Sequence, residues 1–181
     1  MNHKEVVVHR PTLNRGLSPK AVALAGALLA LAVLSPASVP ANAGGTDLPI
    51  KGSGTGTISL NPGNGAFTGV VPGVSGHLGN ITVHIEGVGA RAADGTFTGS
   101  GTATLVAANG DEVRGTITLT QRALTDGHTV TTVVVTITGG TGRFANASGT
   151  LTVTCLSGPP SQVGAMLVIE AECTFTGRIS Y

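Results

Sequence analysis

The feature that most constrains this fold is a two-residue alternation of apolar side chains with threonine, repeated through most of the chain. In the segment 150–154, for example, Leu151 and Val153 alternate with threonines. Successive side chains of a β-strand point to opposite faces, so each such segment presents one apolar and one threonine-rich face. Turn-forming pairs such as Asp94-Gly95 and Asp126-Gly127 separate the segments. The pattern predicts an all-β fold of antiparallel strands joined by hairpins.

We predict eight strands. They are expected at Ile50–Leu60, Ala66–Val71, Asn80–Gly89, Thr96–Ala107, Glu112–Leu124, His128–Thr138, Thr150–Leu156 and Met166–Tyr181. One apolar face on each strand is typical of a single sheet closed on itself or of two sheets packed face to face. The sixth strand is ambiguous because it carries valine on both faces. No segment has a sustained helical period, and 142–147 is the one place where a short helical turn is expected.

Residues 1–43 have the parts of a signal peptide. Basic side chains are spread over residues 1–20, Ala21–Leu34 is an unbroken apolar run, and Ala41-Asn42-Ala43 has the small-x-small pattern of a cleavage site. The apolar run is shorter than the ~20 residues that span a bilayer, which favours a cleaved signal peptide. The alternative is an uncleaved membrane anchor. We therefore expect a secreted, extracellular protein cleaved after Ala43, with a flexible lead-in at 44–49 and a barrel domain at 50–181.

Composition argues against several classes of protein. Charged residues make up 10% of the chain and glycine occurs 28 times, which is typical neither of a disordered chain nor of a helical bundle. After Ala43 the acidic residues outnumber the basic ones, so we expect no nucleic-acid partner and no membrane association once the signal peptide is removed. The sequence indicates no cofactor and no metal, and it leaves the oligomeric state undetermined.

Cys155 and Cys173 are the two cysteines of the chain, and both fall on the apolar parity of their strands. They are symmetric about Gly164, which lies in the connection between the seventh and eighth strands. A cross-strand pair is expected at such positions in an antiparallel hairpin. An even number of cysteines in an oxidising compartment favours a disulfide, with two free buried thiols as the alternative. Closing this loop should contribute about 3 kcal/mol to stability.

The segment Gly139–Gly149 interrupts the alternation between the sixth and seventh strands. Its three leading glycines permit a sharp reversal, its apolar side chains can pack one helical turn against the barrel, and its last glycine returns the chain to a strand. It is not a phosphate-binding loop, because it lacks the Lys-Ser/Thr pair and the following helix. The residues of this structural motif are Gly139, Gly140, Gly142, Arg143, Phe144, Ala147 and Gly149.

These motif residues resemble the Gly-Gly-Thr-Gly-Lys/Arg-Phe-x-x-Ala-x-Gly stretch of dirigent proteins, and more broadly the allene oxide cyclase-like barrel superfamily with its secreted bacterial relatives. The ending Phe175–Tyr181 also resembles the last strand of those bacterial proteins. The resemblance implies a single antiparallel eight-stranded β-barrel with a central cavity. Dirigent proteins steer the coupling of phenoxy radicals, and allene oxide cyclases close a fatty-acid epoxide into a ring. No catalytic residue carries over, because the acidic residues here fall mostly on the threonine-rich face or in turns.

Two pairs of side chains share an outward strand face and are candidate sites. His84 and Glu86 have a spacing that metals can use, but no third ligand is evident. Glu170 and Glu172 are a carboxylate pair of the kind that can divide acid and base roles, but the favoured interpretation is a solvated strand face that protects against edge pairing. Neither pair is assigned a function, and the sequence identifies no catalytic or ligand-binding residue.

One hypothesis places Arg143 in an anion site, because backbone N–H groups of a glycine-rich turn can hold an anion. The favoured interpretation is that it caps the turn or pairs with a carboxylate. His77 and His128 sit at strand starts without a visible acid or nucleophile partner. Asn80 and Asn146 begin glycosylation sequons, which also occur by chance.

Three functional hypotheses follow. The first is a non-enzymatic secreted barrel that binds a small lipophilic molecule in its interior. The second is a dirigent-like or cyclase-like enzyme in which the pocket preorganises a hydrophobic substrate. The third is a surface-adhesion or ice-binding module that uses the outward threonine rows, although threonine is also simply a good strand former.

Overall fold

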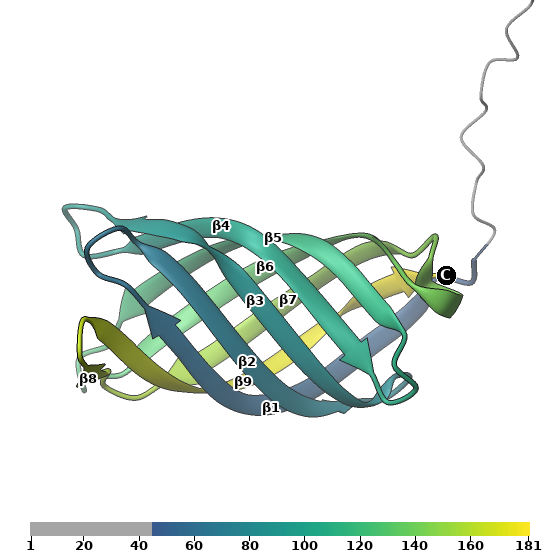
Figure 1. Ribbon diagram of the computed structural model, residues 1–181, viewed down its shortest axis with the longest axis horizontal. Helices are drawn as coiled ribbons and strands as arrows, with labels where there is room; N and C mark the ends of the chain where they lie inside the picture. The colour runs from purple at the N-terminus through teal and green to yellow at the C-terminus, as the bar shows by residue number, and fades with distance from the viewer. Residues whose placement is uncertain (1–44) are drawn as a thin grey trace, which may run out of the picture. The chain divides into compact units, whose positions relative to one another are not determined.

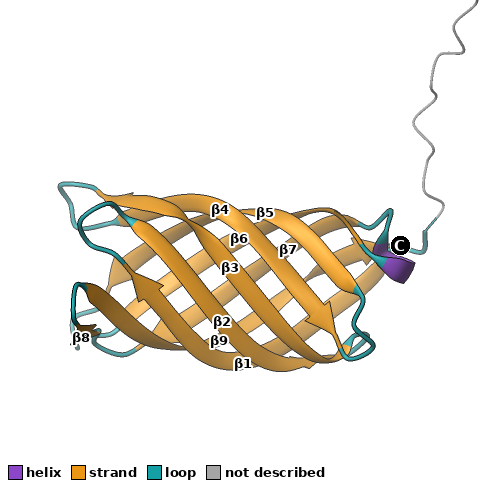
Figure 2. Ribbon diagram, viewed as in Figure 1, coloured by secondary structure: helices purple, strands orange, loops and turns teal. Residues whose placement is uncertain are grey.

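The computed structural model describes residues 45–181, so the expected signal peptide at 1–43 lies outside the described residues. Nearly all of this part of the chain is strand (Figures 1 and 2). The elements are β1 (Leu48–Leu60), β2 (Ala66–Ser75), β3 (Gly79–Arg91), β4 (Phe97–Ala107), β5 (Glu112–Ala123), β6 (Thr129–Gly140), the 3-10 turn η1 (Gly142–Phe144), β7 (Ser148–Ser157), β8 (Ser161–Val163) and β9 (Met166–Ser180).

The strands form a closed antiparallel barrel. Sequential neighbours pair from β1 to β7, β7 pairs with β9, and β9 closes the barrel by pairing with β1 along its whole length, from Leu48↔Ile179 to Leu60↔Leu167. Closure removes both open edges of the sheet, which would otherwise present unpaired backbone groups. The predicted eight-stranded barrel with one short helical turn is confirmed, and the alternative of two facing sheets is excluded.

Most strand boundaries differ from expectation by one or two residues, and three differences matter for the fold. β1 begins at Leu48, inside the segment expected to be a lead-in. β2 runs through Pro72 instead of ending before it, because its ladder with β3 continues through Pro72↔Thr82. The ladder between β1 and β2, by contrast, is interrupted opposite Pro72, which has no N–H to donate. The short strand β8 was not predicted, and it pairs with the start of β9.

The two-residue period correctly assigned the faces. On β3, Ile81 is buried and Glu86 is exposed, as the alternation requires. The ambiguity of the sixth strand is resolved by its neighbours in the closed sheet. Val133 and Val135 face the interior and pack against its core, whereas Val134 is 40% exposed on the outer face.

Phenylalanine rings cover glycines on the inner wall. Phe67 lies directly opposite Gly87, and a Cβ atom on that glycine would come within 2.6 Å of the Phe67 ring. Phe175 lies opposite Gly52 in the same way, and a Cβ there would overlap its ring. Phe67, Phe97 and Phe175 each begin a Phe-Thr-Gly tripeptide, and each ring fills the space that a glycine of a neighbouring strand leaves.

The interior core forms two clusters, one toward each end of the barrel. The cap end carries η1, the β2–β3 and β4–β5 turns and the C-terminus; it lies on the right in Figure 1. Its cluster includes Ile50, Leu78, Phe144 and Ile179. The loop end carries the β1–β2, β3–β4 and β5–β6 turns and the connection with β8; its cluster includes Leu60, Phe67 and Phe97.

Candidate functional site

The segment Gly139–Gly149 closes the cap end. Phe144 has no exposed surface and Ala147 is 3% exposed, so both side chains belong to the core cluster at this end. The ring of Phe144 meets that of Tyr181 edge to face, with centroids 4.7 Å apart. The predicted packing of one turn against the barrel is confirmed, although the regular turn covers only Gly142–Phe144.

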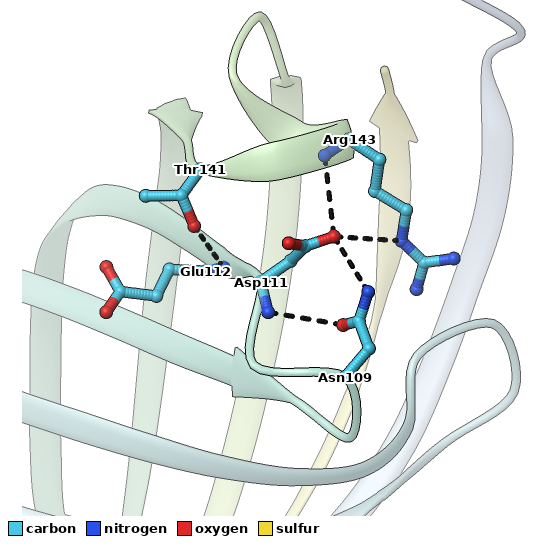
Figure 3. Close-up of polar contacts among 5 residues, drawn as sticks. All are labelled: Asn109, Asp111, Glu112, Thr141 and Arg143. Carbon is cyan, nitrogen blue, oxygen red and sulfur yellow. Dashed lines mark hydrogen bonds and ion pairs between the residues drawn. The ribbon is translucent and has the colours of Figure 1, made fainter.

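A polar network ties this segment to the β4–β5 turn (Figure 3). The amide of Glu112 donates to Thr141 Oγ1 at 2.9 Å, and the Thr141 amide donates back to the Glu112 carbonyl at 2.9 Å. Asp111 Oδ2 accepts from the Asn109 side-chain amide at 2.8 Å and from the Arg143 backbone amide at 3.4 Å. The Glu112–Thr141 and Asp111–Arg143 bonds join residues far apart in sequence, so they hold the cap on the barrel, and the Asn109 bond orients the Asp111 carboxylate.

Arg143 is part of this packing. Its guanidinium lies 4.6 Å from the centroid of the Phe144 ring, and its Nε is 4.0 Å from Asp111 Oδ2. The turn amides are used internally, since Phe144 N donates to the Thr141 carbonyl and Ala145 N to that of Gly142. With these donors engaged and a carboxylate already beside the guanidinium, the segment is poorly suited to hold an anion.

The barrel interior contains a central cavity of about 110 Å³. Its walls are aliphatic and aromatic side chains, including Ile117, Val135, Leu151 and Phe175, together with the disulfide. Among the described residues that line it, Arg114 is the one titratable group, and its guanidinium is turned outward to Glu112 at 2.6 Å. The cavity thus offers shape and apolar contact, without an acid or base.

A second space, the mouth cavity, lies toward the loop end and measures about 80 Å³. It shares several wall residues with the central cavity, Ile85 and Leu119 among them, so the two are neighbours inside the barrel. Its wall also includes three polar side chains, those of Gln121, Thr131 and Ser157. In the sequence, the only sign of these residues is that each is polar at a position where its strand otherwise carries apolar side chains.

Cys155 and Cys173 form a disulfide, as predicted. They are direct register partners on β7 and β9, and both contribute to the wall of the central cavity. The bridge therefore holds together two strands of the wall at mid-barrel.

The titratable pairs proposed from sequence lie on the outer face. His84 and Glu86 are exposed and flanked across the sheet by Val70 and Thr102, respectively, and Thr102 Oγ1 approaches Glu86 Oε1 at 3.5 Å. Glu170 and Glu172 are likewise both exposed, on β9. Within residues 45–181, no three His, Cys, Asp or Glu side chains gather as a metal site would require.

The remaining histidines and sequons are peripheral. His77 is exposed in the β2–β3 turn, and His128 stands before β6 with its Nδ1 3.3 Å from Asp126 Oδ2. Asn80 and Asn146 are both exposed, so either sequon is sterically open to modification.

The outward threonines form rows that sequence alone did not align. One row crosses five strands in direct register, from β4 to β9. Its members are Thr98, Thr120, Thr132, Thr154 and Thr174. Because the sheet closes on itself, the row follows the curve of the barrel and does not present a plane.

Comparisons of the chain with protein-family models, with curated proteins and with solved structures give no match. The likeness of Gly139–Gly149 to dirigent proteins therefore rests on that motif and on the strand pattern. Within the described residues, no helix has the length and apolar character of a membrane span.

Proposed function

We propose that this protein is an exported, non-enzymatic barrel that holds one small, uncharged, lipophilic molecule in its interior. The observation that carries the proposal is the central cavity of about 110 Å³ with apolar walls. Closed eight-stranded barrels either fill their interior with side chains or hold one small ligand. Here Gly54 and Gly73 are part of the cavity wall and contribute no side chain to its interior.

The size of the cavity limits the ligand. An apolar cavity of roughly 150 Å³ stays dry and accepts benzene or xenon. A space of about 110 Å³ therefore suits a single ring or a short branched alkane, and the mouth cavity of about 80 Å³ adds room for a short extension. A long acyl chain exceeds both together.

Export is part of the proposal. Its support is the signal-peptide pattern of residues 1–43 together with the disulfide, since disulfides form and persist mainly in oxidising compartments. Membership of the dirigent and allene oxide cyclase-like superfamily is likewise proposed. Its support is the motif at Gly139–Gly149, placed between the sixth and seventh strands of an eight-stranded barrel.

The enzymatic alternative has less support. Acid–base catalysis needs a titratable group within reach of the substrate. Among residues 45–181, no Asp, Glu, His, Lys or Tyr side chain lines either interior cavity. A dirigent-like role would rest on shape alone, and an adhesive role would rest on the curved threonine rows.

The test is binding of a small apolar probe. The full chain, secreted by an expression host, is titrated with toluene while methyl resonances are followed by NMR. We expect saturable shifts for methyl groups of Ile117, Val135 and Leu151. The filling variant Ala103→Leu, at a buried wall position, should lose binding, whereas Ala90→Leu on the outer face of β3 should keep it. The proposal is refuted if neither toluene nor another single-ring probe gives saturable shifts. It is also refuted if both variants bind the probe equally well.

A further inference from the structure

The interior changes character along the barrel axis. On β5, the inward positions run from Val113 through Ile117 and Leu119 to Gln121. On β7, they run from apolar residues to Ser157. The change from apolar to polar happens at the same end on neighbouring strands, which is the loop end.

The polar side chains at this end are neighbours in the sheet. Gln121 on β5 is the direct register partner of Thr131 on β6. Ser157 on β7 pairs with Thr129, one inward position away from Thr131. All three line the mouth cavity, so three successive strands contribute one polar group each to one wall.

All three residues take inward positions at the loop end of their strands. Ser157 is 3% exposed, and Gln121 and Thr131 are half-buried. A buried polar group costs free energy unless it is hydrogen-bonded. Gln121 Nε2 donates to Thr129 Oγ1 at 3.2 Å, a bond that orients the amide and does not use its Oε1 acceptor.

Resting on the proposed function, we infer that the ligand is an amphipathic molecule with one uncharged polar group, an alcohol or a ketone, held at Gln121, Thr131 and Ser157. Its apolar body occupies the central cavity and its polar group the mouth cavity. An amide and two hydroxyls offer both donors and acceptors, which suits a hydroxyl or carbonyl oxygen. They offer no charge, so a carboxylate or an ammonium group would be buried without a counter-ion.

The inference is tested with a matched pair of alicyclic probes. Propylcyclohexane and 2-cyclohexylethanol have the same shape and differ by a hydroxyl in place of a methyl group. Their dissociation constants are measured for the native protein and for the near-isosteric variants Thr131→Val, Ser157→Ala and Gln121→Met. Thr132→Val, an exposed outward position on β6, is the matched control, and circular dichroism checks the fold of each variant.

We expect each cavity variant to raise the dissociation constant of the alcohol by roughly 3- to 10-fold, which corresponds to the net contribution of one neutral hydrogen bond. The dissociation constant of the hydrocarbon should stay the same or fall. Thr132→Val should change the dissociation constant of neither probe. A second readout is the position of the alcohol, whose CH₂OH protons should show NOEs to the Thr131 methyl group.

The outcomes separate the two proposals. If neither probe binds the native protein, the proposed function fails. If both bind and all three variants leave their affinity ratio unchanged, the apolar site stands and the polar-group inference is wrong. If one variant fails to fold, the other two and the NOE measurement still decide the inference.

Discussion

The substitution Phe144→Ala tests whether Gly139–Gly149 is the structural cap of the barrel. Phe144 has no exposed surface and its ring contacts the Tyr181 ring and the Arg143 guanidinium. Truncating a buried phenylalanine costs about 3–5 kcal/mol, which includes the cavity left behind. Because the edge-to-face pair contributes roughly 0.5–1.5 kcal/mol of its own, we expect a loss of about 4 kcal/mol.

The assay is equilibrium urea denaturation followed by far-UV circular dichroism. A loss of about 4 kcal/mol is a large part of the 5–15 kcal/mol typical of a domain. Phe144→Leu keeps most of the side-chain volume and should cost much less. Val163→Ala, at a position that is 62% exposed, should change stability by less than about 0.5 kcal/mol. A double-mutant cycle with Tyr181→Ala should give a coupling of about 1 kcal/mol.

Two results would refute this reasoning. One is a loss of less than about 1 kcal/mol, which would mean that the ring does not fill a packed site. The other is a Phe144→Ala protein of native stability that no longer binds a ligand, which would make the segment a binding element and not a cap.

Three further predictions concern the turns and the disulfide. Replacing both cysteines with serine should cost about 3 kcal/mol in urea denaturation, given a loop of 18 residues, and an unchanged midpoint would contradict the loop-entropy argument. Gly142→Ala should cost clearly more than Gly110→Ala. Both glycines have positive φ, but a Cβ on Gly142 would overlap the Asp111 carboxylate, whereas one on Gly110 meets nothing within 4 Å. Equal losses of stability in urea denaturation would show that the Asp111 side chain moves aside without cost. The hydrogen bond from the His128 amide lowers the pKa of Asp126 below its ordinary 3.8, so this contact stabilises the fold above that pH and is lost as pH falls through the lowered value. An NMR titration of the carboxyl carbon should find the midpoint below 3.8, and a midpoint at or above it would contradict the prediction.

Much of the fold follows from local periodicity. The alternation along Ile81 to Ile85 determines which side chains share a face, whatever the strand pairs with. The symmetric positions of Cys155 and Cys173 about Gly164 predict their pairing, since hairpin register follows from the connection. The strand predicted to end at Val71 continues through Pro72, because proline breaks only the ladder that needs its N–H.

The candidate site was much less predictable. Arg143 and Asp111 meet across a turn and a strand, and nothing in the spacing of the sequence pairs them. In the sequence, Gln121, Thr131 and Ser157 are only polar residues at positions where apolar side chains are expected. That observation gains meaning once their three strands are known to be neighbours. The central cavity depends on which side chains face it from all around the barrel.

The sequence by itself therefore determined the eight strands of the barrel, the faces of all but the sixth, the disulfide and the corner at Gly139–Gly149. The tertiary structure alone decided that β9 closes on β1, that Val134 points outward, and that Gln121, Thr131 and Ser157 line the same interior cavity. The physical reason is range. Alternation and turn chemistry act within a few residues, whereas closure, register between distant strands and the shape of the interior depend on contacts that the whole barrel makes together.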